Sequence, residues 1–211
     1  MRLWIVCSGE AALKLPTRCT LAEYNALCER ALDGGIEEGS SRPVAANGRR
    51  VYCSPRASAR ETAARLVSGA EIEPEPLLDE LPRPADGSRR ALPLWLLRFW
   101  LWLRRLFGEG RAEGRARADA LIDRLEKRGE DCVLISHPAM ITALIDALRV
   151  RGYCVQRTGL GRIRPYEQML LSRRDEHCGG CQHNCLLSNP GCNIGRDKAK
   201  RQHLTTDTDR V

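Results

Sequence analysis

The sequence lacks a long apolar run, a leader-like N-terminus and an internal repeat. No stretch reaches the roughly 18 consecutive apolar residues that a membrane-spanning helix needs. The opening residues MRLWIVCSGE form a short apolar run without a small-residue cleavage site, which excludes the usual pattern of a signal peptide. We therefore expect a cytoplasmic protein whose first residues form a buried strand.

Aromatic residues are also scarce, at 5% of the chain, and half of them lie in one segment. Residues 91–107 contain three of the four Trp and both Phe, interleaved with Arg. On a helix, Trp95, Phe99 and Trp102 would share one face. Such a face is typical of a lid over a ligand pocket, a homodimer interface or a helix on an anionic membrane surface. Nucleic acid is not the expected partner, because no known binding motif accompanies the charge.

Positive charge is concentrated around the same segment. The net charge is +7, and residues 81–117 alone hold nine Arg and three acidic residues. The rest of the chain is therefore close to neutral. Any attraction for phosphate or for an anionic surface is expected in this region.

Short apolar runs alternate with helical patterns along most of the chain. Strands are expected at Arg2–Val6, Arg50–Cys53, Cys132–Ile135, around Val155 and at Glu167–Leu171. Helices are expected between them, and the Pro-rich residues 71–90 are expected to form a loop. This alternation predicts an α/β fold: a three-layer sandwich with a mainly parallel sheet, helices on both faces and a small Cys-rich C-terminal appendage.

Two helix starts carry specific signals. Thr20 and Glu23 form a capping box ahead of a helix that runs to about Leu32. Ser54 and Pro55 are expected to serve as the N-cap and first helical position of the next helix.

The pattern divides the chain into three parts. Residues 1–172 are expected to form the α/β domain, with 91–107 as an aromatic and basic helical insertion. Residues 173–195 form a Cys-rich, metal-binding segment, and residues 196–211 a flexible tail.

Three segments together resemble the histidine phosphatase superfamily, the phosphoglycerate mutase-like proteins. LWIVCSGE resembles the family's first strand followed by Arg-His-Gly-Glu. VYCSPRASARETAARL resembles its second signature, in which Ser-Ser-Pro precedes an Arg-Ala pair and Thr-Ala. VLISHPAMITALI resembles its third, a strand followed by a His and a helix. Order and spacing fit from about Arg2 to Leu171.

The resemblance implies a phosphate site at the carboxyl ends of the strands. In the family one His attacks phosphorus, two Arg and a second His hold the phosphoryl oxygens, and a carboxylate acts as general acid. The loops after Val6, Cys53 and Ser136 would form this site here. The helices that follow two of these loops would direct their N-termini at the phosphate.

This chain departs from the family pattern at the positions on which the family's catalysis depends. Ser8 falls at the position of the nucleophilic His, and Cys7 and Ser58 fall where the family has Arg. Only the second His is retained, as His137. A Ser hydroxyl needs an adjacent base to attack, and phosphoryl transfer depends on fixed positive charge.

The resemblance therefore predicts a pseudoenzyme that binds a phosphorylated or other anionic small molecule. The predicted catalytic positions are His137, Ser8 and Glu80, with Asp79 as the alternative carboxylate; the predicted ligand-binding residues are Cys7, Gly9, Ser54, Arg56, Ser58 and Arg60. An active phosphomonoesterase, in which His137 works with Ser8 or a water, is the alternative. On a simpler interpretation, Ser8 and Gly9 form only a turn, and Arg56 and Arg60 only a solvated helix face.

Four of the ten cysteines crowd into fifteen residues near the end of the chain: Cys178, Cys181, Cys185 and Cys192. In a reducing compartment this spacing predicts a metal site before it predicts disulfides. The sequence supports either zinc or an iron–sulfur cluster, with disulfides or free thiols as the alternative. A metal- or redox-sensing protein that uses the α/β domain as a scaffold is a third hypothesis.

Overall fold

The computed structural model describes residues 1–11, 13, 15–37, 43–44, 46, 48–67, 69–83, 90–106, 110–157 and 161–173. Its strands are β1 (Arg2–Cys7), β2 (Arg18–Cys19), β3 (Arg50–Cys53), β4 (Ile72–Pro74), β5 (Leu92–Pro93), β6 (Cys132–Ser136), β7 (Tyr153–Arg157) and β8 (Gln168–Arg173). Its helices are α1 (Leu21–Asp33), α2 (Ala57–Leu66), the short 3-10 helix η1 (Pro76–Leu78), α3 (Leu94–Leu106), α4 (Arg111–Arg128) and α5 (Pro138–Val150).

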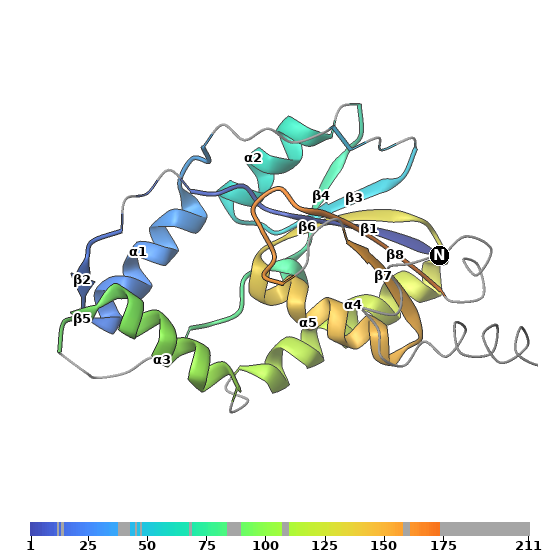
Figure 1. Ribbon diagram of the computed structural model, residues 1–211. Helices are drawn as coiled ribbons and strands as arrows, with labels where there is room; N and C mark the ends of the chain where they lie inside the picture. The colour runs from blue at the N-terminus through green and yellow to red at the C-terminus, as the bar shows by residue number, and fades with distance from the viewer. Residues whose placement is uncertain are drawn as a thin grey trace, which may run out of the picture.

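Six strands form one sheet in the order β4-β3-β6-β1-β8-β7, and β2 and β5 form a separate antiparallel pair (Figure 1). β4, β3, β6 and β1 run parallel to one another, whereas β8 is antiparallel to both β1 and β7. The expected mainly parallel α/β sheet is confirmed.

Strand β4 lies within the Pro-rich stretch that was expected to be a loop. It has three residues, too few for an alternating pattern to be recognised. β4 is at the edge of the sheet, where Pro74 does not interrupt a ladder on both sides. The expectation of a loop over all of residues 71–90 is therefore wrong for this short segment.

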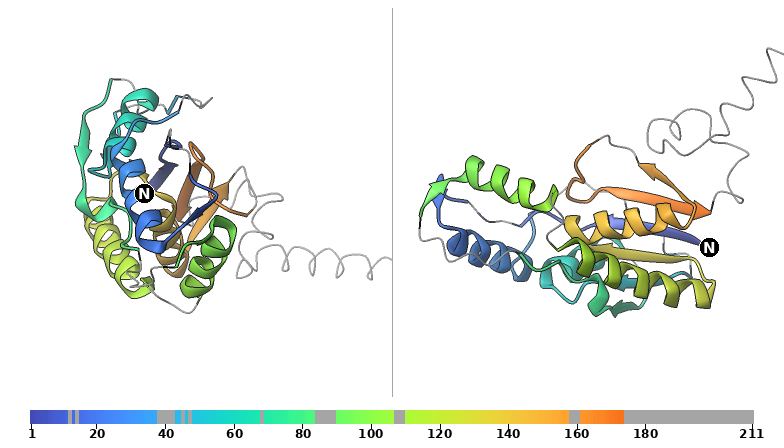
Figure 2. Two further views of the ribbon diagram at one scale, coloured as in Figure 1. Left: turned by 90° about the vertical axis from the view of Figure 1, so that its left-hand side faces the viewer. Right: turned by 90° about the horizontal axis from the view of Figure 1, so that it is seen from below.

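Alternate residues of β6 pack into two different cores. Cys132 and Leu134 belong to the core formed with α4 and α5, while Val133 and Ile135 belong to the core formed with α2. The pleat of a strand buried on both faces produces this division. Figure 2 shows the helices on both sides of the sheet, with α1 and α3 extending beyond one of its ends. The predicted three layers are thus present.

The two predicted helix starts have different outcomes. The capping box is confirmed: the Glu23 N–H donates to Thr20 Oγ1 at 3.2 Å, and the Thr20 N–H donates to Glu23 Oε2 at 2.8 Å. The start predicted at Ser54 is wrong, because α2 begins at Ala57 with Arg56 as its N-cap. The Ser54 hydroxyl still accepts from the Arg56 N–H at 3.3 Å and also contacts His137, but the regular helix begins only at Ala57.

Among the described residues, no helix is both long and apolar enough to cross a bilayer.

Candidate functional site

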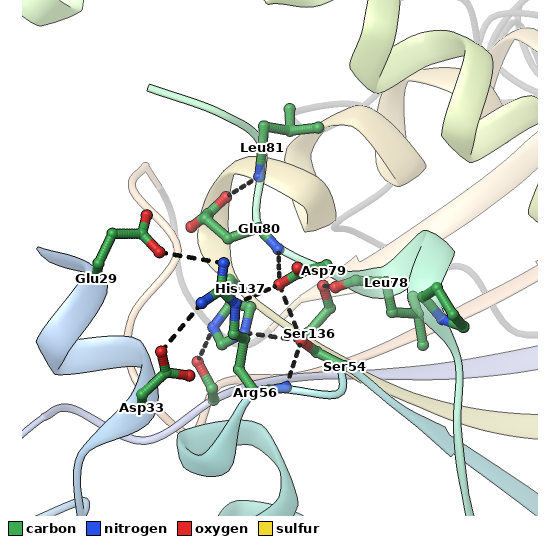
Figure 3. A network of polar contacts seen from close by, with 12 residues as sticks. Glu29, Asp33, Ser54, Arg56, Leu78, Asp79, Glu80, Leu81, Ser136 and His137 are labelled. Carbon is green, nitrogen blue, oxygen red and sulfur yellow. Dashed lines mark hydrogen bonds and ion pairs between the residues drawn. The ribbon is translucent and has the colours of Figure 1, made fainter. Parts of the chain in front are cut away.

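Three side chains that are distant in the sequence meet where β1, β3 and β6 end. Ser8, Ser54 and His137 each follow the last residue of one of these strands. Ser8 Oγ lies 2.9 Å from His137 Nδ1. On the other side of the ring, His137 Nε2 lies 3.1 Å from Ser54 Oγ (Figure 3). The predicted convergence of these residues at one edge of the sheet is confirmed.

Backbone hydrogen bonds fix this convergence. The Ser8 N–H donates to the Ser136 carbonyl at 2.8 Å, and the Ser54 N–H donates to the Ile135 carbonyl at 2.9 Å. Each bond continues the strand pairing by one residue beyond the end of β1 or β3. The two hydroxyls are therefore held by the sheet itself and not by a loose loop.

The centre of the site is closed to solvent. Ser8, Ser54 and His137 are 6%, 0% and 1% exposed. Burial is the main cause that lowers the pKa of His137 to about 4; the charge of Asp79 opposes this shift and that of Arg56 adds to it. The imidazole is consequently neutral at pH 7, with one nitrogen that donates and one that accepts.

The neighbouring carboxylate sets the direction of the hydrogen bonds. Ser54 Oγ donates to Asp79 Oδ1 at 3.5 Å, because an ionised carboxylate can only accept. With its proton used there, Ser54 Oγ accepts from the Nε2–H of His137. Nδ1 then accepts from the Ser8 hydroxyl. This tautomer gives a continuous chain of donors, from Ser8 through His137 and Ser54 to Asp79.

Arg56 is the cation nearest to this chain, and it is surrounded by acidic groups (Figure 3). Its Nε donates to Asp79 Oδ1 at 2.9 Å, and its terminal nitrogens lie 3.1 Å from carboxylate oxygens of Glu29 and Asp33. Glu29 and Asp33 are four residues apart on α1, which places both on the face toward α2. Three carboxylates therefore already pair with the guanidinium of Arg56, which a phosphate at this position would need.

A cavity of about 390 Å³ opens beside this group. Its lining contains Asn25, Glu29, Arg56, Asp79, Glu80, Leu81, Pro82, Arg83, Glu113 and Arg117. Three Arg face four carboxylates there, so the lining has no excess of positive charge. Arg83 pairs with Glu29 at 2.9 Å, and Arg117 lies 3.6 Å from Glu113. A bare phosphate dianion would have to compete with these internal pairs.

Tyr166 covers the loop after β1. A Cβ at Gly9 would lie 2.5 Å from the Tyr166 ring, so only Gly fits at this position. Tyr166 is held by its hydroxyl, which donates to the Glu37 carbonyl at 2.6 Å, and by its N–H, which donates to the Cys7 carbonyl at 3.1 Å. It adopts a left-handed φ of 59°, which is uncommon for a bulky residue. This contact contributes to the closure around Ser8.

The other predicted residues are placed unevenly around the site. The Cys7 side chain lies in the core with α4 and α5, and burial raises the pKa of its thiol to about 12, so it is neither a ligand to a phosphate nor a thiolate nucleophile. Ser58 is buried on α2, and its hydroxyl has no hydrogen-bond partner among the described residues. Glu80 lines the cavity, whereas Arg60 is exposed on α2 and does not line it.

Sequence reasoning missed Glu29, Asp33 and Tyr166. The spacing of Glu29 and Asp33 by four residues was visible, but nothing in the sequence indicates that α1 faces Arg56. Tyr166 follows a loop, and its approach to Gly9 depends on the pairing of β8 with β1. These three residues complete or cover the site from elements outside the recognised motifs.

The four clustered cysteines lie outside the described residues. Cys178, Cys181, Cys185 and Cys192 all follow residue 173, so the predicted metal centre remains a prediction. Within the described ranges, no group of three or more His, Cys, Asp or Glu side chains could hold a metal ion. The six cysteines of the domain itself are all free.

A mainly parallel sheet with three polar loops at one carboxyl edge defines an α/β domain with a polar site at its strand ends. The model of the histidine phosphatase superfamily (branch 1) matches residues 41–156, more than half of the chain. The chain belongs to this superfamily. The matched range includes the segments of Ser54 and His137 but begins after Ser8.

Solved structures of phosphatases resemble this fold at low sequence identity. A mutant phosphoserine phosphatase from Entamoeba histolytica, in complex with phosphoserine, is 19% identical with a TM-score of 0.46; the alignment covers 71% of this chain and 80% of that one. A mycobacterial glucosyl-3-phosphoglycerate phosphatase, in complex with VO3, is 18% identical with a TM-score of 0.47, and the alignment covers 81% and 92%. No curated protein matches the chain.

Proposed function

We propose that the chain is a pseudoenzyme of the histidine phosphatase superfamily. The observation that carries this proposal is the hydrogen bonding of Ser8, at the nucleophile position. In the described part of the chain, the side-chain hydrogen bonds of Ser8 and His137 join them only to each other and to Ser54. No Arg donor reaches the Ser8 hydroxyl, and Cys7 and Ser58 carry no charge to replace one. Phosphoryl transfer without fixed positive charge at the reacting group is strongly disfavoured.

An assay of phosphomonoester hydrolysis tests this proposal. We expect p-nitrophenyl phosphate to be hydrolysed at a rate no higher than that of a matched Ser8→Ala, His137→Ala double variant. Thermal unfolding of both proteins checks that each is folded. A robust wild-type rate that disappears in the double variant would show that the centre is catalytic.

The cavity supports a ligand that carries both an anionic and a cationic group. Arg56, Arg83 and Arg117 offer guanidinium groups, while Glu29, Glu80, Glu113 and Asp79 offer carboxylates. A simple dianion would satisfy the first set and repel the second. The ligand class is therefore narrower than the predicted phosphorylated or anionic small molecule. We propose a zwitterion, such as a phosphate ester that bears an ammonium group.

Phosphoethanolamine and ethyl phosphate form a matched pair of probes, because they differ by one ammonium group. We expect calorimetry to detect tighter binding of phosphoethanolamine, and Glu80→Gln to reduce that preference. Glu61→Gln, on α2 and outside the lining of the cavity, serves as the control variant. Equal affinity for the two probes would contradict the zwitterion proposal without restoring a catalytic role.

An active hydrolase is the second candidate, and the 2.9 Å contact between Ser8 Oγ and His137 Nδ1 favours it. His137 has the tautomer that a general base requires, as argued above. Two observations weigh against it. A pKa of about 4 makes the imidazole a weak proton acceptor at pH 7, and Ser8 is only 6% exposed. A phosphorylated Ser8 trapped by mass spectrometry after incubation with substrate would establish this second function.

We further propose that Cys178, Cys181, Cys185 and Cys192 bind zinc or an iron–sulfur cluster. The support is their spacing in the sequence, with two thiols of the Cys178–Cys181 pair placed to chelate one metal. A stretch this short has no core of its own, so a metal would account for its folding. If the centre is a redox-active cluster, the domain would act as a scaffold for a sensor.

A further inference from the structure

The aromatic helix α3 has one face against the protein and one in solvent. Leu97 is 2% exposed and packs with Cys19 and Leu21 in a small core beside α1. Trp95 and Phe99, four residues apart, are 71% and 53% exposed. Spacing of four places both on one helix face. The side chain of Trp102, expected on the same face, lies outside the part of the chain that the structure describes.

This exposure is concentrated on α3. Three large hydrophobic side chains in the described ranges are exposed to solvent. Two of them are Trp95 and Phe99, and the third is Val150 at the end of α5. Figures 1 and 2 show α3 at the outer side of the molecule, beyond the end of the sheet. Exposed aromatic residues gathered on one outward face mark an interaction surface.

The predicted lid role for this helix finds no support in the cavity. Its lining comes from α1, α4 and residues between Arg56 and Arg83, and none of the lining residues belongs to α3. The Trp95–Phe99 face is directed away from the α1 side of the helix, where Leu97 packs. The exposed surfaces of Trp95 and Phe99 are therefore accessible to another molecule.

The positive charge of residues 87–108 favours a negatively charged partner. Residues 87–108 contain five Arg and no Asp or Glu. Arg98 is exposed and lies between Trp95 and Phe99 in the sequence. Arg104 stacks on Trp100, with its guanidinium carbon 4.5 Å from the ring centroid. A two-fold dimer through this face would bring the same Arg-rich patch against itself, which is repulsive.

We propose that α3 binds the surface of an anionic lipid bilayer through Trp95 and Phe99. Trp is suited to the boundary between headgroups and acyl chains, where its ring is partly apolar and its N–H remains hydrated. Arg98, which is exposed and also hydrogen-bonds Tyr24 of α1, then meets lipid headgroups of opposite charge. Each basic side chain near such a surface strengthens binding by about fivefold, so the contribution of several Arg is substantial.

Sedimentation with lipid vesicles tests this proposal on the full chain. We expect the wild-type protein to bind vesicles that contain phosphatidylserine and to bind phosphatidylcholine vesicles at least about tenfold more weakly, because the headgroup charge is absent. The Trp95→Ser, Phe99→Ser double variant should lose most of the binding. Val150→Ser removes the other exposed hydrophobic side chain and should bind like wild type.

Circular dichroism and size-exclusion chromatography complete the experiment. Both variants change exposed residues, so their helix content should equal that of the wild type. Wild-type protein that fails to bind phosphatidylserine vesicles would overturn the proposal, as would a double variant that binds equally well. A wild-type dimer that the double variant converts to a monomer, without vesicle binding by either protein, would assign the face to self-association.

Discussion

At the scale of single residues, the most informative feature is a neutral His in a closed site. His137 is 1% exposed, and its two ring nitrogens are hydrogen-bonded to Ser8 and Ser54. A proton added to the ring would place a charge where little water can solvate it, and the positive charge of Arg56 adds to this cost. The pKa of His137 is therefore lowered from its ordinary value of 6.5 to about 4.

This shift predicts how stability depends on pH. Between pH 6.5 and about 4 the unfolded chain binds a proton at His137 that the folded chain does not, so acidification favours unfolding. The stability contribution of the neutral His is fully present above pH 6.5 and is lost as the pH falls toward 4. We expect this single group to cost the wild type of the order of 3 kcal/mol of unfolding free energy across that range.

Urea denaturation at several pH values measures the effect against a His137→Asn variant. Asn does not titrate, so the variant should lose less stability between pH 6.5 and 4, even though it starts from a lower value at pH 7. Parallel curves for the two proteins would mean that His137 keeps an ordinary pKa. Such a result would contradict the burial of the His137 ring.

At the scale of elements, α1 determines the electrostatics of the site. It carries Glu29 and Asp33, whose carboxylates pair with the guanidinium of Arg56. An anionic ligand would have to displace these pairs to bind Arg56. The helix is started by the capping box of Thr20 and Glu23, which satisfies two N–H groups that would otherwise lack partners. A local sequence signal thus positions a helix whose functional contacts are long-range.

Removal of the cap should weaken α1 measurably. We expect Thr20→Ala to lower the unfolding free energy by about 1 kcal/mol. Thr142→Ala is the matched control, because the Thr142 hydroxyl donates to the Pro138 carbonyl within α5 and caps no helix end. That change should be neutral or slightly stabilising, since Ala has the higher helix propensity. Equal effects of the two substitutions, measured by urea denaturation, would argue that the capping box contributes nothing specific.

At the scale of the whole molecule, the chain combines a domain that has its own core with a Cys-rich segment that we propose to bind a metal. The domain core includes fully buried residues from β1, β6, α4 and α5. The thiolates of the tail, in contrast, would be held by a metal, which requires them to be deprotonated. The two parts should therefore respond differently to acid and to chelators.

Metal analysis on protein purified anaerobically and without a metal-affinity tag tests this difference. We expect one metal centre per chain, and its loss in a Cys178→Ser, Cys181→Ser variant. Cys28→Ser, in the domain, is the control and should retain the metal. A chelator should release the metal while the far-UV spectrum of the domain persists. Equal metal content in wild type and the double variant would exclude these thiols as the main ligands.

The sequence determined the order of strands and helices and the edge at which Ser8, Ser54 and His137 meet. Apolar runs such as Cys132–Ile135 reveal buried strands because both faces of a parallel sheet are covered. The carboxyl ends of parallel strands lie at one edge, so residues that follow three of them can be expected to converge without knowledge of any contact. The prediction that Cys7, Ser8 and Ser58 stand where the family has Arg or His likewise rests on their positions in the sequence alone.

Only the tertiary structure decided what surrounds that edge. The pairing of Arg56 with Glu29 and Asp33, and the approach of Tyr166 to Gly9, join elements that are far apart in the chain. The Ser54 hydroxyl likewise has partners that local rules do not predict, because it contacts His137 and Asp79 as well as the Arg56 N–H. Local patterns encode the energy of a helix or strand, whereas the partners of a side chain depend on how those elements pack.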